Sequence, residues 1–222
     1  MTASRTARDR VRAELTREIK EEARRQLADV GAGGLSLRAV ARELGMVSSA
    51  LYRYFPSRDD LLTALILDAY DAVGEVAEAV PTARPREQWR AVCHAVRGWA
   101  VEHRHEYALI YGSPVPGYTA PQHTIPSAGR VAAVLLEVLN REPLTPAFEG
   151  PPLTPGLASQ VGQLDFGLPD AVMARVIVVW TQLFGMISFE LFGHLVGSVD
   201  PSDEFFAHAV EQMADFIGLP AA

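Results

Sequence analysis

The side chains with the clearest chemical potential lie between Ser36 and Phe55, where two short helical segments are expected to meet at a tight turn. Ala41 is small enough to let these segments approach closely, and Gly45, four residues later, can supply the turn. Such a hairpin leaves hydroxyl, phenol and guanidinium groups on the outer side of its second segment. These groups can bond to phosphates and to base edges, so the pattern fits a helix-turn-helix that binds double-stranded DNA. The spacing alone also fits a structural hairpin of another all-helical protein.

The expected DNA contacts follow from the chemistry of each side chain. Short residues at the start of the second segment let it enter a major groove. There Ala50 or Val47 can contact a thymine methyl group, and Arg38 can donate two hydrogen bonds to a guanine. Phosphates are within reach of Tyr52, Tyr54 and Arg58. The predicted DNA-binding residues are Ser36, Arg38, Val47, Ser48, Ser49, Ala50, Tyr52, Arg53, Tyr54 and Arg58.

Four titratable side chains further along have the residue types of a metal site. His103 and His105 are two positions apart, so on a helix they point to different faces. Only Glu102 and Glu106 share a face, and a solvated helix end is therefore favoured. The sequence has no nucleophile–base motif and no phosphate-binding loop, and Cys93 is its only cysteine. We expect no catalytic site, no metal and no cofactor.

Aromatic side chains in the second half of the chain can bury an apolar ligand, while tyrosine hydroxyls can orient one polar group on it. We expect a mostly apolar pocket between the helix that starts near Pro85 and the helix over residues 170–195. Each aromatic residue, taken singly, is also consistent with ordinary core packing. The candidate ligand-binding residues are Trp99, Tyr107, Tyr111, Phe184 and Phe189.

Charge is distributed unevenly along the 222 residues, whose net charge is −7. Residues 1–60 carry 12 Arg/Lys and 9 Asp/Glu, a net charge of +3, so the rest of the chain carries −10. A local basic patch is what phosphate binding requires. The first arginines can form either an arm that contacts DNA or a solvated helix end; they are Arg5, Arg8, Arg10 and Arg12.

The elements that position these groups are expected to be helices, because apolar residues recur at helical spacing and no segment alternates with period two. The proline-rich segment 143–169 is expected to be irregular and mobile. We predict nine helices, over about residues 8–30, 36–45, 51–55, 57–80, 85–103, 106–111, 127–142, 170–195 and 202–217.

The sequence also bears on the cellular compartment. Its first ten residues are polar and basic, without the apolar core of a secretory signal. The longest charge-free apolar stretch, Val176–Phe189, has 14 residues, fewer than the roughly 20 that span a bilayer. We expect a cytoplasmic protein without a membrane partner.

Two stretches of the hairpin region closely resemble the TetR/AcrR family of transcriptional regulators: Gly34-Leu-Ser-Leu-Arg-Ala-Val-Ala-Arg-Glu-Leu-Gly and Leu51-Tyr-Arg-Tyr-Phe-Pro-Ser-Arg-Asp-Asp-Leu-Leu. The resemblance covers about residues 12–70. It departs at Val47 and Ser49, where the family often has Ser and Gly. Val47 cannot cap a helix, so Ser48 is expected to do so. The segment from Trp99 to Tyr118 resembles a recurrent C-terminal subtype of the same family.

The resemblance implies an all-α, TetR-like fold of about nine helices. A three-helix head over residues 1–57 would bind DNA, the helix over 57–80 would link it to the body, and residues 58–222 would bind ligand and dimerise. The implied function is a regulator, usually a repressor, that a largely apolar small-molecule effector releases from a palindromic operator. Two rival classes remain at this point: a helical enzyme, and a protein-interaction domain that does not bind DNA.

Two apolar stripes close the chain, and they can be either the core of a monomer or an interface. The resemblance favours the second, because the last two helices of the family form a four-helix interface in a homodimer. The predicted interface residues are Trp180, Phe205, Ala209, Met213 and Phe216.

Overall fold

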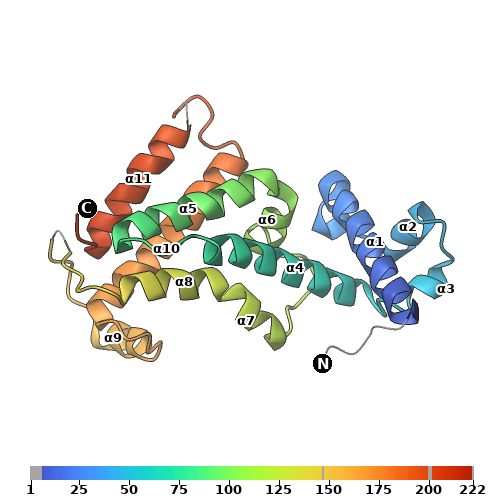
Figure 1. The fold of residues 1–222 in the computed structure, drawn as a ribbon, viewed down its shortest axis with the longest axis horizontal. Coiled ribbons are helices and arrows are strands. Elements are labelled where there is room, and N and C mark those ends of the chain that lie inside the picture. Colours follow the sequence, from blue (N-terminus) through green and yellow to red (C-terminus); the bar gives the residue numbers. More distant parts are fainter. Residues whose placement is uncertain (1–6, 147, 200–201, 222) are drawn as a thin grey trace. The chain divides into compact units, whose positions relative to one another are not determined.

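The computed structural model describes residues 7–146, 148–199 and 202–221, and within these ranges the regular elements are all helical (Figure 1). In chain order they are α1 (Ala7–Val30), the 3-10 turn η1 (Ala32–Gly34), α2 (Leu37–Glu43), α3 (Ser48–Leu51), α4 (Arg58–Glu78), α5 (Pro85–Glu102), α6 (Arg104–Tyr111), the 3-10 turn η2 (Gln122–Thr124), α7 (Ile125–Ala128), α8 (Arg130–Leu139), α9 (Pro155–Gly162), α10 (Asp170–Leu191) and α11 (Ser202–Ile217). The all-α prediction is confirmed.

The chain divides into two compact units. The first runs to Tyr70 and also includes His103–Ser127, and the second comprises Asp71–Glu102 and the chain from Ala128 onward. Helix α4 therefore contributes its first half to one unit and its second half to the other. The functional boundary that the sequence suggests, after residue 57, stays a prediction.

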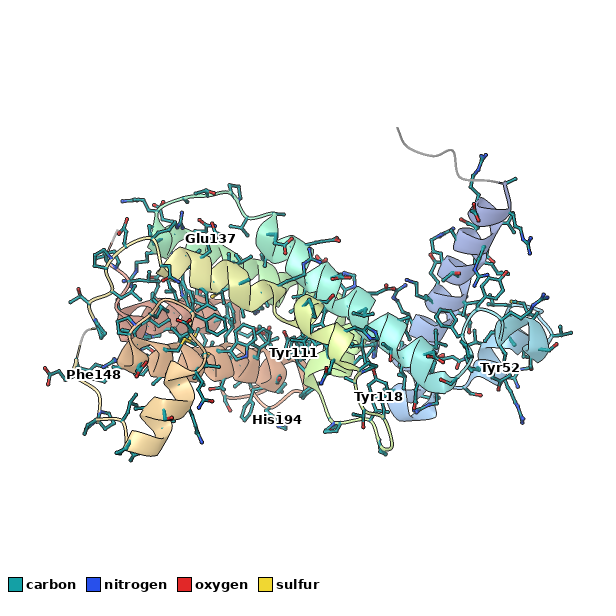
Figure 2. The ribbon with its side chains drawn as sticks, turned by 90° about the horizontal axis from the view of Figure 1, so that it is seen from below. Tyr52, Tyr111, Tyr118, Glu137, Phe148 and His194 are labelled. Atoms are coloured by element: carbon teal, nitrogen blue, oxygen red, sulfur yellow. The ribbon has the colours of Figure 1, made fainter. Side chains whose placement is uncertain are left out.

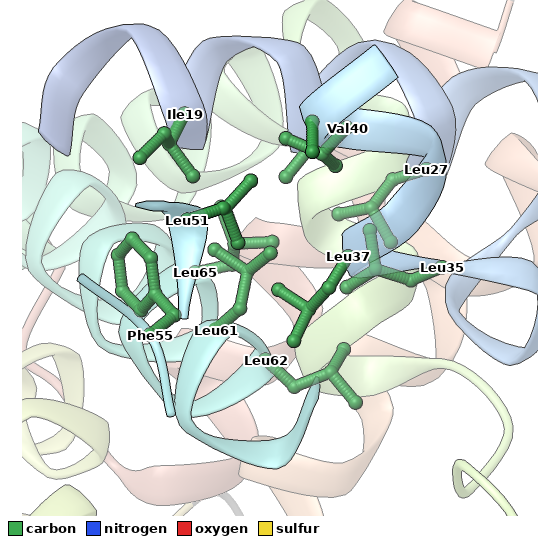
Figure 3. Packing of buried hydrophobic residues seen from close by; sticks show 12 residues of the cluster. Ile19, Leu27, Leu35, Leu37, Val40, Leu51, Phe55, Leu61, Leu62 and Leu65 are labelled. Atoms are coloured by element: carbon green, nitrogen blue, oxygen red, sulfur yellow. The ribbon is translucent and has the colours of Figure 1, made fainter. Parts of the chain in front are cut away.

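The first unit is built around a cluster of aliphatic side chains (Figure 3). Ile19 and Leu27 of α1 face Val40 of α2 and Leu51 of α3, and all four are at most 4% exposed. Burying an aliphatic side chain of this size contributes about 1.5–3 kcal/mol, so the cluster holds the short helices that could not be stable alone. Leu61 and Leu65 bring α4 into the same cluster.

The second unit packs α5 against α8, α10 and α11. Trp89 of α5 is 2% exposed, and its indole nitrogen donates a hydrogen bond to the carbonyl oxygen of Val210 at 3.3 Å. Leu183 of α10 and Met213 of α11 are also buried. The apolar faces of the last two helices are therefore partly used within the chain itself.

The two additional helices arise where the sequence predicts an irregular segment and where it predicts one continuous helix. Helix α9 lies in the proline-rich segment, where the hydroxyl of Thr154 accepts from the amide of Leu157 at 3.4 Å and Pro155 takes the first helical position. Proline is favoured there because it lacks only an amide that the helix would not use. The single helix expected over 127–142 is divided into α7 and α8, with Gly129 between them.

By length and composition, α10 is the one helix among the described residues that could cross a membrane. It has 22 residues, a mean hydropathy of 1.7 in its most apolar window, and 39% of that window buried. It packs on α5, α9 and α11.

Candidate nucleic-acid interface

The hairpin formed by α2 and α3 has the local features that its sequence predicts. The hydroxyl of Ser36 caps α2 by accepting from the amide of Ala39 at 3.4 Å. Gly45 has a φ of +64°, and the amide of Met46 then bonds to the carbonyl of Ala41 at 2.8 Å. Because L side chains rarely adopt that φ, glycine is the residue that allows this turn.

The start of α3 differs from the expectation. Val47 is the N-cap residue and has no side-chain capping bond, while Ser48 is already the first helical residue. The helix is a single turn that ends at Leu51, which is completely buried. The residues after it form turns, so Tyr52 and Arg53 follow α3 and do not belong to a longer helix.

Half of the ten predicted DNA-binding side chains are exposed. Val47 is 70% exposed and Tyr52 is 41% exposed, and Figure 2 shows Tyr52 on the hairpin. Arg38, Ser49 and Arg53 are also exposed. The remaining hairpin positions are partly buried: Ser36, Ser48, Ala50 and Tyr54.

The arginines of the hairpin region differ in their ion pairs. Among the described residues, Arg38 and Arg53 have no carboxylate partner, whereas Arg42 pairs with Glu43 at 3.3 Å. The charges of Arg38 and Arg53 are thus not neutralised within the protein. Tyr54 is oriented by α1, since the guanidinium carbon of Arg12 lies 5.6 Å from the centre of its ring.

Arg58, expected to contact phosphate, is bound to the main chain in this conformation. Its Nε donates to the carbonyl of Leu35 at 3.1 Å, and Nη2 donates to the carbonyl of Ala32 at 2.7 Å. The guanidinium thereby ties the start of α4 to the turn before α2. No local pattern indicates this contact, because its partners lie 23 and 26 positions away.

An ion-pair network joins α1, α4 and α6 within the first unit. Asp68 accepts from Lys20 at 2.8 Å and also from Arg24. Arg24 donates in addition to Glu106 at 3.1 Å. The other oxygen of Glu106 lies 3.1 Å from Nδ1 of His103, so this carboxylate takes part in a salt-bridge network of the first unit.

Described residues of the second unit line two cavities that bear on ligand binding. The smaller has a volume of about 200 Å³, is almost wholly apolar, and lies among α5, α8 and α10. Its position between α5 and α10 agrees with the expected pocket, but its lining does not. It is lined by Trp89, Ala132, Leu135, Leu136, Phe166, Met173, Val176, Ile177, Val179, Trp180 and Leu183.

The five candidate ligand-binding residues lie outside that lining. Trp99 and Phe184 are buried elsewhere in the second unit, and Phe189 is 56% exposed. Tyr107 and Tyr111 belong to the first unit, where their ring centres are 5.2 Å apart. Burial raises the pKa of Tyr111 above its usual value, as does the nearby phenol of Tyr70. The lining residues Trp89 and Trp180 carried no signal that separates them from other core aromatics.

The predicted interface residues differ in accessibility. Phe205 is 37% exposed, and Trp180 and Phe216 are half-buried. Ala209 and Met213 are buried in the chain's own core, at 3% and 1% exposure, so neither offers a surface in this conformation. Exposed apolar side chains also occur on α10, at Ile177, Val178 and Phe189.

Comparison with known proteins gives consistent matches. The family described as "Bacterial regulatory proteins, tetR family" matches residues 19–65, and "Tetracyclin repressor-like, C-terminal domain" matches residues 89–213. The HTH-type transcriptional regulators Mb1846 of Mycobacterium bovis and Rv1816 of Mycobacterium tuberculosis are each 41% identical over 203 residues, which is 85% of this chain and 84% of theirs.

Solved structures show the same fold. The regulatory protein SCO4313 superposes with a TM-score of 0.79 at 31% identity, over 94% of this chain and 98% of that chain. BioQ, solved with its double-stranded DNA operator, superposes with a TM-score of 0.52 at 19% identity, over 90% of this chain and 97% of its own.

Proposed function

Because the chain belongs to the TetR family, and is therefore a DNA-binding transcriptional regulator and not an enzyme, we propose that it represses transcription as an effector-responsive homodimer. Its hairpins would occupy successive major grooves of a palindromic operator. A small molecule bound in the second unit would release the DNA. The observation that carries the DNA-binding part is the pair of exposed, unneutralised arginines on the hairpin, Arg38 and Arg53.

The proposed roles of the hairpin residues follow from their accessibility. Arg38 donates to a guanine, Val47 or Ala50 contacts a thymine methyl group, and Tyr52 bonds to a phosphate. Arg53 adds a phosphate contact. We assign Arg58 a positioning role, since its guanidinium is already bound to main-chain carbonyls. BioQ, which shares the fold, was solved with its double-stranded DNA operator, and this supports DNA binding by such a fold.

A homodimer is supported by the apolar surface on the last helices. Phe205 of α11 and Phe189 of α10 are large side chains that the chain itself leaves accessible. Two copies that bury such faces against each other would present two hairpins with two-fold symmetry, which a palindromic site requires.

The apolar cavity among α5, α8 and α10 is the proposed effector site. Its volume of about 200 Å³ is below the roughly 300–1,000 Å³ of drug-sized pockets. A compact, uncharged molecule therefore fits it best. Since the target is genomic DNA, we place the protein in the cytoplasm.

The test is fluorescence anisotropy with DNA from upstream of the protein's own gene. Replacing Arg53 with Ala should weaken binding and flatten its salt dependence, because one phosphate contact per protomer is lost. Replacing Arg42, which is paired with Glu43, with Ala is the matched control and should change the affinity little. If the unaltered protein binds this DNA and unrelated DNA equally at every salt concentration, the proposal of a specific operator there is wrong.

A further inference from the structure

Arg175 on α10 stands out because it is a buried cation, at 8% exposure. Its Nη1 donates to the carbonyl oxygen of Phe216 at 2.9 Å, and Nη2 donates to the carbonyl oxygen of Phe148. The guanidinium carbon also lies 4.9 Å from the ring centre of each of these phenylalanines. The group is therefore held in place by two main-chain carbonyls and by two neighbouring aromatic rings.

No carboxylate neutralises this charge within the described ranges of the chain. Two other arginines of the second unit do have acidic partners: Arg97 pairs with Glu190 at 2.6 Å, and Arg130 pairs with Glu78 at 2.7 Å. Removing a charge from water without a counterion is costly. A guanidinium has five N–H donors, and the main-chain carbonyls use two of those on Arg175.

Arg175 borders the larger of the two cavities, whose volume is about 490 Å³. This volume lies within the range of roughly 300–1,000 Å³ that small-molecule pockets have. The main chain approaches the guanidinium closely at Gly150, where an added Cβ would lie 3.2 Å from Nη2. Phe148, which is labelled in Figure 2, also lines this cavity.

The rest of the lining is apolar. Aliphatic side chains from the loop before α9, from α9 and from α10 form it, namely Leu153, Leu157, Val161, Ile177 and Val178. Arg175 is the one charged residue in the lining. A single cation at the side of an apolar pocket matches a single negative charge on an apolar chain, whereas a phosphate dianion would need a second cation.

We propose that this pocket binds an aliphatic carboxylate, with its carboxylate oxygens on the free N–H groups of Arg175 and its chain against α9 and α10. The planar guanidinium fork fits two carboxylate oxygens side by side. The site is distinct from the smaller cavity proposed for the effector, and its test uses no DNA. The proposal therefore stands or falls independently of the proposed function.

The test is isothermal titration calorimetry on the full-length protein with decanoate, kept below its micellar concentration. Decan-1-ol and decylamine have the same chain without a negative charge. Decanoate should bind at one site per protomer, and the alcohol and the amine should bind at least about tenfold more weakly, because a hydrogen bond to a charged group is lost. Equal binding of all three probes, or no binding of decanoate, overturns the proposal.

Variants at Val178 test the site without removing the guanidinium. Val178 lines the pocket, is 50% exposed, and lies one helical turn after Arg175, so a glutamate there would provide an internal carboxylate partner. Val178→Glu should weaken decanoate binding by about ten- to a hundredfold, the range expected for charge-assisted hydrogen bonds. Glutamine has the size of glutamate but no charge. Val178→Gln should therefore bind decanoate with an affinity within about twofold to threefold of that of the unaltered protein.

Arg175→Gln should also lose decanoate binding. This substitution removes two hydrogen bonds to the main chain and can therefore prevent folding. In that case the comparison of Val178→Glu with Val178→Gln decides. Sedimentation velocity on the Val178 variants tests the other occupant of this surface, a second copy of the chain. If Val178→Glu turns a dimer into a monomer while decanoate binding is unchanged, this face is a subunit interface and the carboxylate site is wrong.

Discussion

Nε of Arg24 lies 3.1 Å from a carboxylate oxygen of Glu106, across 82 positions of sequence. The same guanidinium also contacts Asp68, which in turn accepts from Lys20. These contacts attach α6 and the first half of α4 to α1. The side chains are 19–30% exposed, so solvent screens the network only in part.

The network makes Asp68 more important than Glu106 for stability. Asp68→Asn weakens two ion pairs with permanently charged side chains of α1, while Glu106→Gln weakens the pair with Arg24 and the contact with the imidazole of His103. We expect a loss of about 1–2 kcal/mol in the free energy of unfolding for the first variant and about 0.5–1 kcal/mol for the second. Urea unfolding at fixed protein concentration measures both. An equal effect of the two substitutions would show that the second ion pair of Asp68 contributes no more than the contact of Glu106 with His103.

Gly45 is needed for its conformation and not for space. An added Cβ would meet nothing within 4 Å, so Gly45→Ala should cost about 1–2 kcal/mol through the positive φ alone, and operator affinity should fall as the hairpin distorts. Gly98→Ala is the matched control, since that glycine lies inside α5, has no positive φ and also has open space around it. It should stabilise the protein by about 0.5–1 kcal/mol. Urea unfolding of Gly45→Ala and Gly98→Ala measures whether each substitution lowers or raises the free energy of unfolding.

Base recognition should depend on Arg38 and phosphate anchoring on Tyr52. Arg38→Ala should cost about 1–3 kcal/mol in binding and relax the preference at one base pair per half-site. Tyr52→Phe should weaken binding to all sequences alike, because a phosphate contact carries no base information. Selection of binding sites from a randomised DNA library separates the two effects. An unchanged selected site for Arg38→Ala would remove the guanine contact from the proposal.

Adjacent phenylalanines of α11 should respond differently to charge. Phe205 is 37% exposed in the protomer, whereas Phe206 is 2% exposed and lies 5.0 Å from the guanidinium carbon of Arg97. Phe205→Glu should leave the protomer folded and convert the dimer to a monomer with reduced operator affinity. Phe206→Glu should prevent folding, since the new charge would be buried. Sedimentation and circular dichroism distinguish these outcomes; a dimeric Phe205→Glu with intact DNA binding would place the interface elsewhere.

The ion pair of Arg97 with Glu190 predicts a dependence of stability on pH. Hydrogen bonds from Arg97 at 2.6 and 2.7 Å hold the pKa of Glu190 below its ordinary value. A carboxyl group whose pKa is lower in the folded state than in the unfolded state stabilises the fold. This stabilisation is fully present above the unfolded-state pKa, about 4.3, and is lost as the pH falls through the folded-state pKa. Glu190→Gln should cost about 1–2 kcal/mol at neutral pH and less in acid. We expect the urea midpoints of the unaltered protein and of Glu190→Gln to converge as the pH is lowered from 7 to 3. A difference in midpoint that stays constant over this range contradicts the prediction.

The features that could be predicted from the sequence are those that depend on a few consecutive residues. Ser36 and Gly45 are recognisable because a cap and a left-handed turn are properties of a few consecutive residues. Thr154 and Pro155 carry an equally local signal for α9, which the surrounding prolines obscured.

Contacts between residues that are far apart in the sequence could not be predicted in this way, because they depend on how the helices pack. The sequence groups Glu106 with the histidines beside it, and the structure adds Arg24 of α1 as a partner. The sequence predicts a phosphate contact for Arg58, whose guanidinium binds main-chain carbonyls in this conformation. The lining of the apolar cavity depends on which faces of α5, α8 and α10 meet, and periodicity gives the face of each helix but not its neighbour.

Ile177 of α10 borders both the 200 Å³ cavity and the 490 Å³ pocket. The side chain is thus a partition between two spaces of different chemistry, one neutral and one with a cation. A rotation of this side chain that enlarges one space reduces the other, so occupants of the two would compete for volume without touching each other. Shortening this side chain with Ile177→Ala would enlarge the volume available on both sides and reduce that competition, so one side chain influences the size of both spaces.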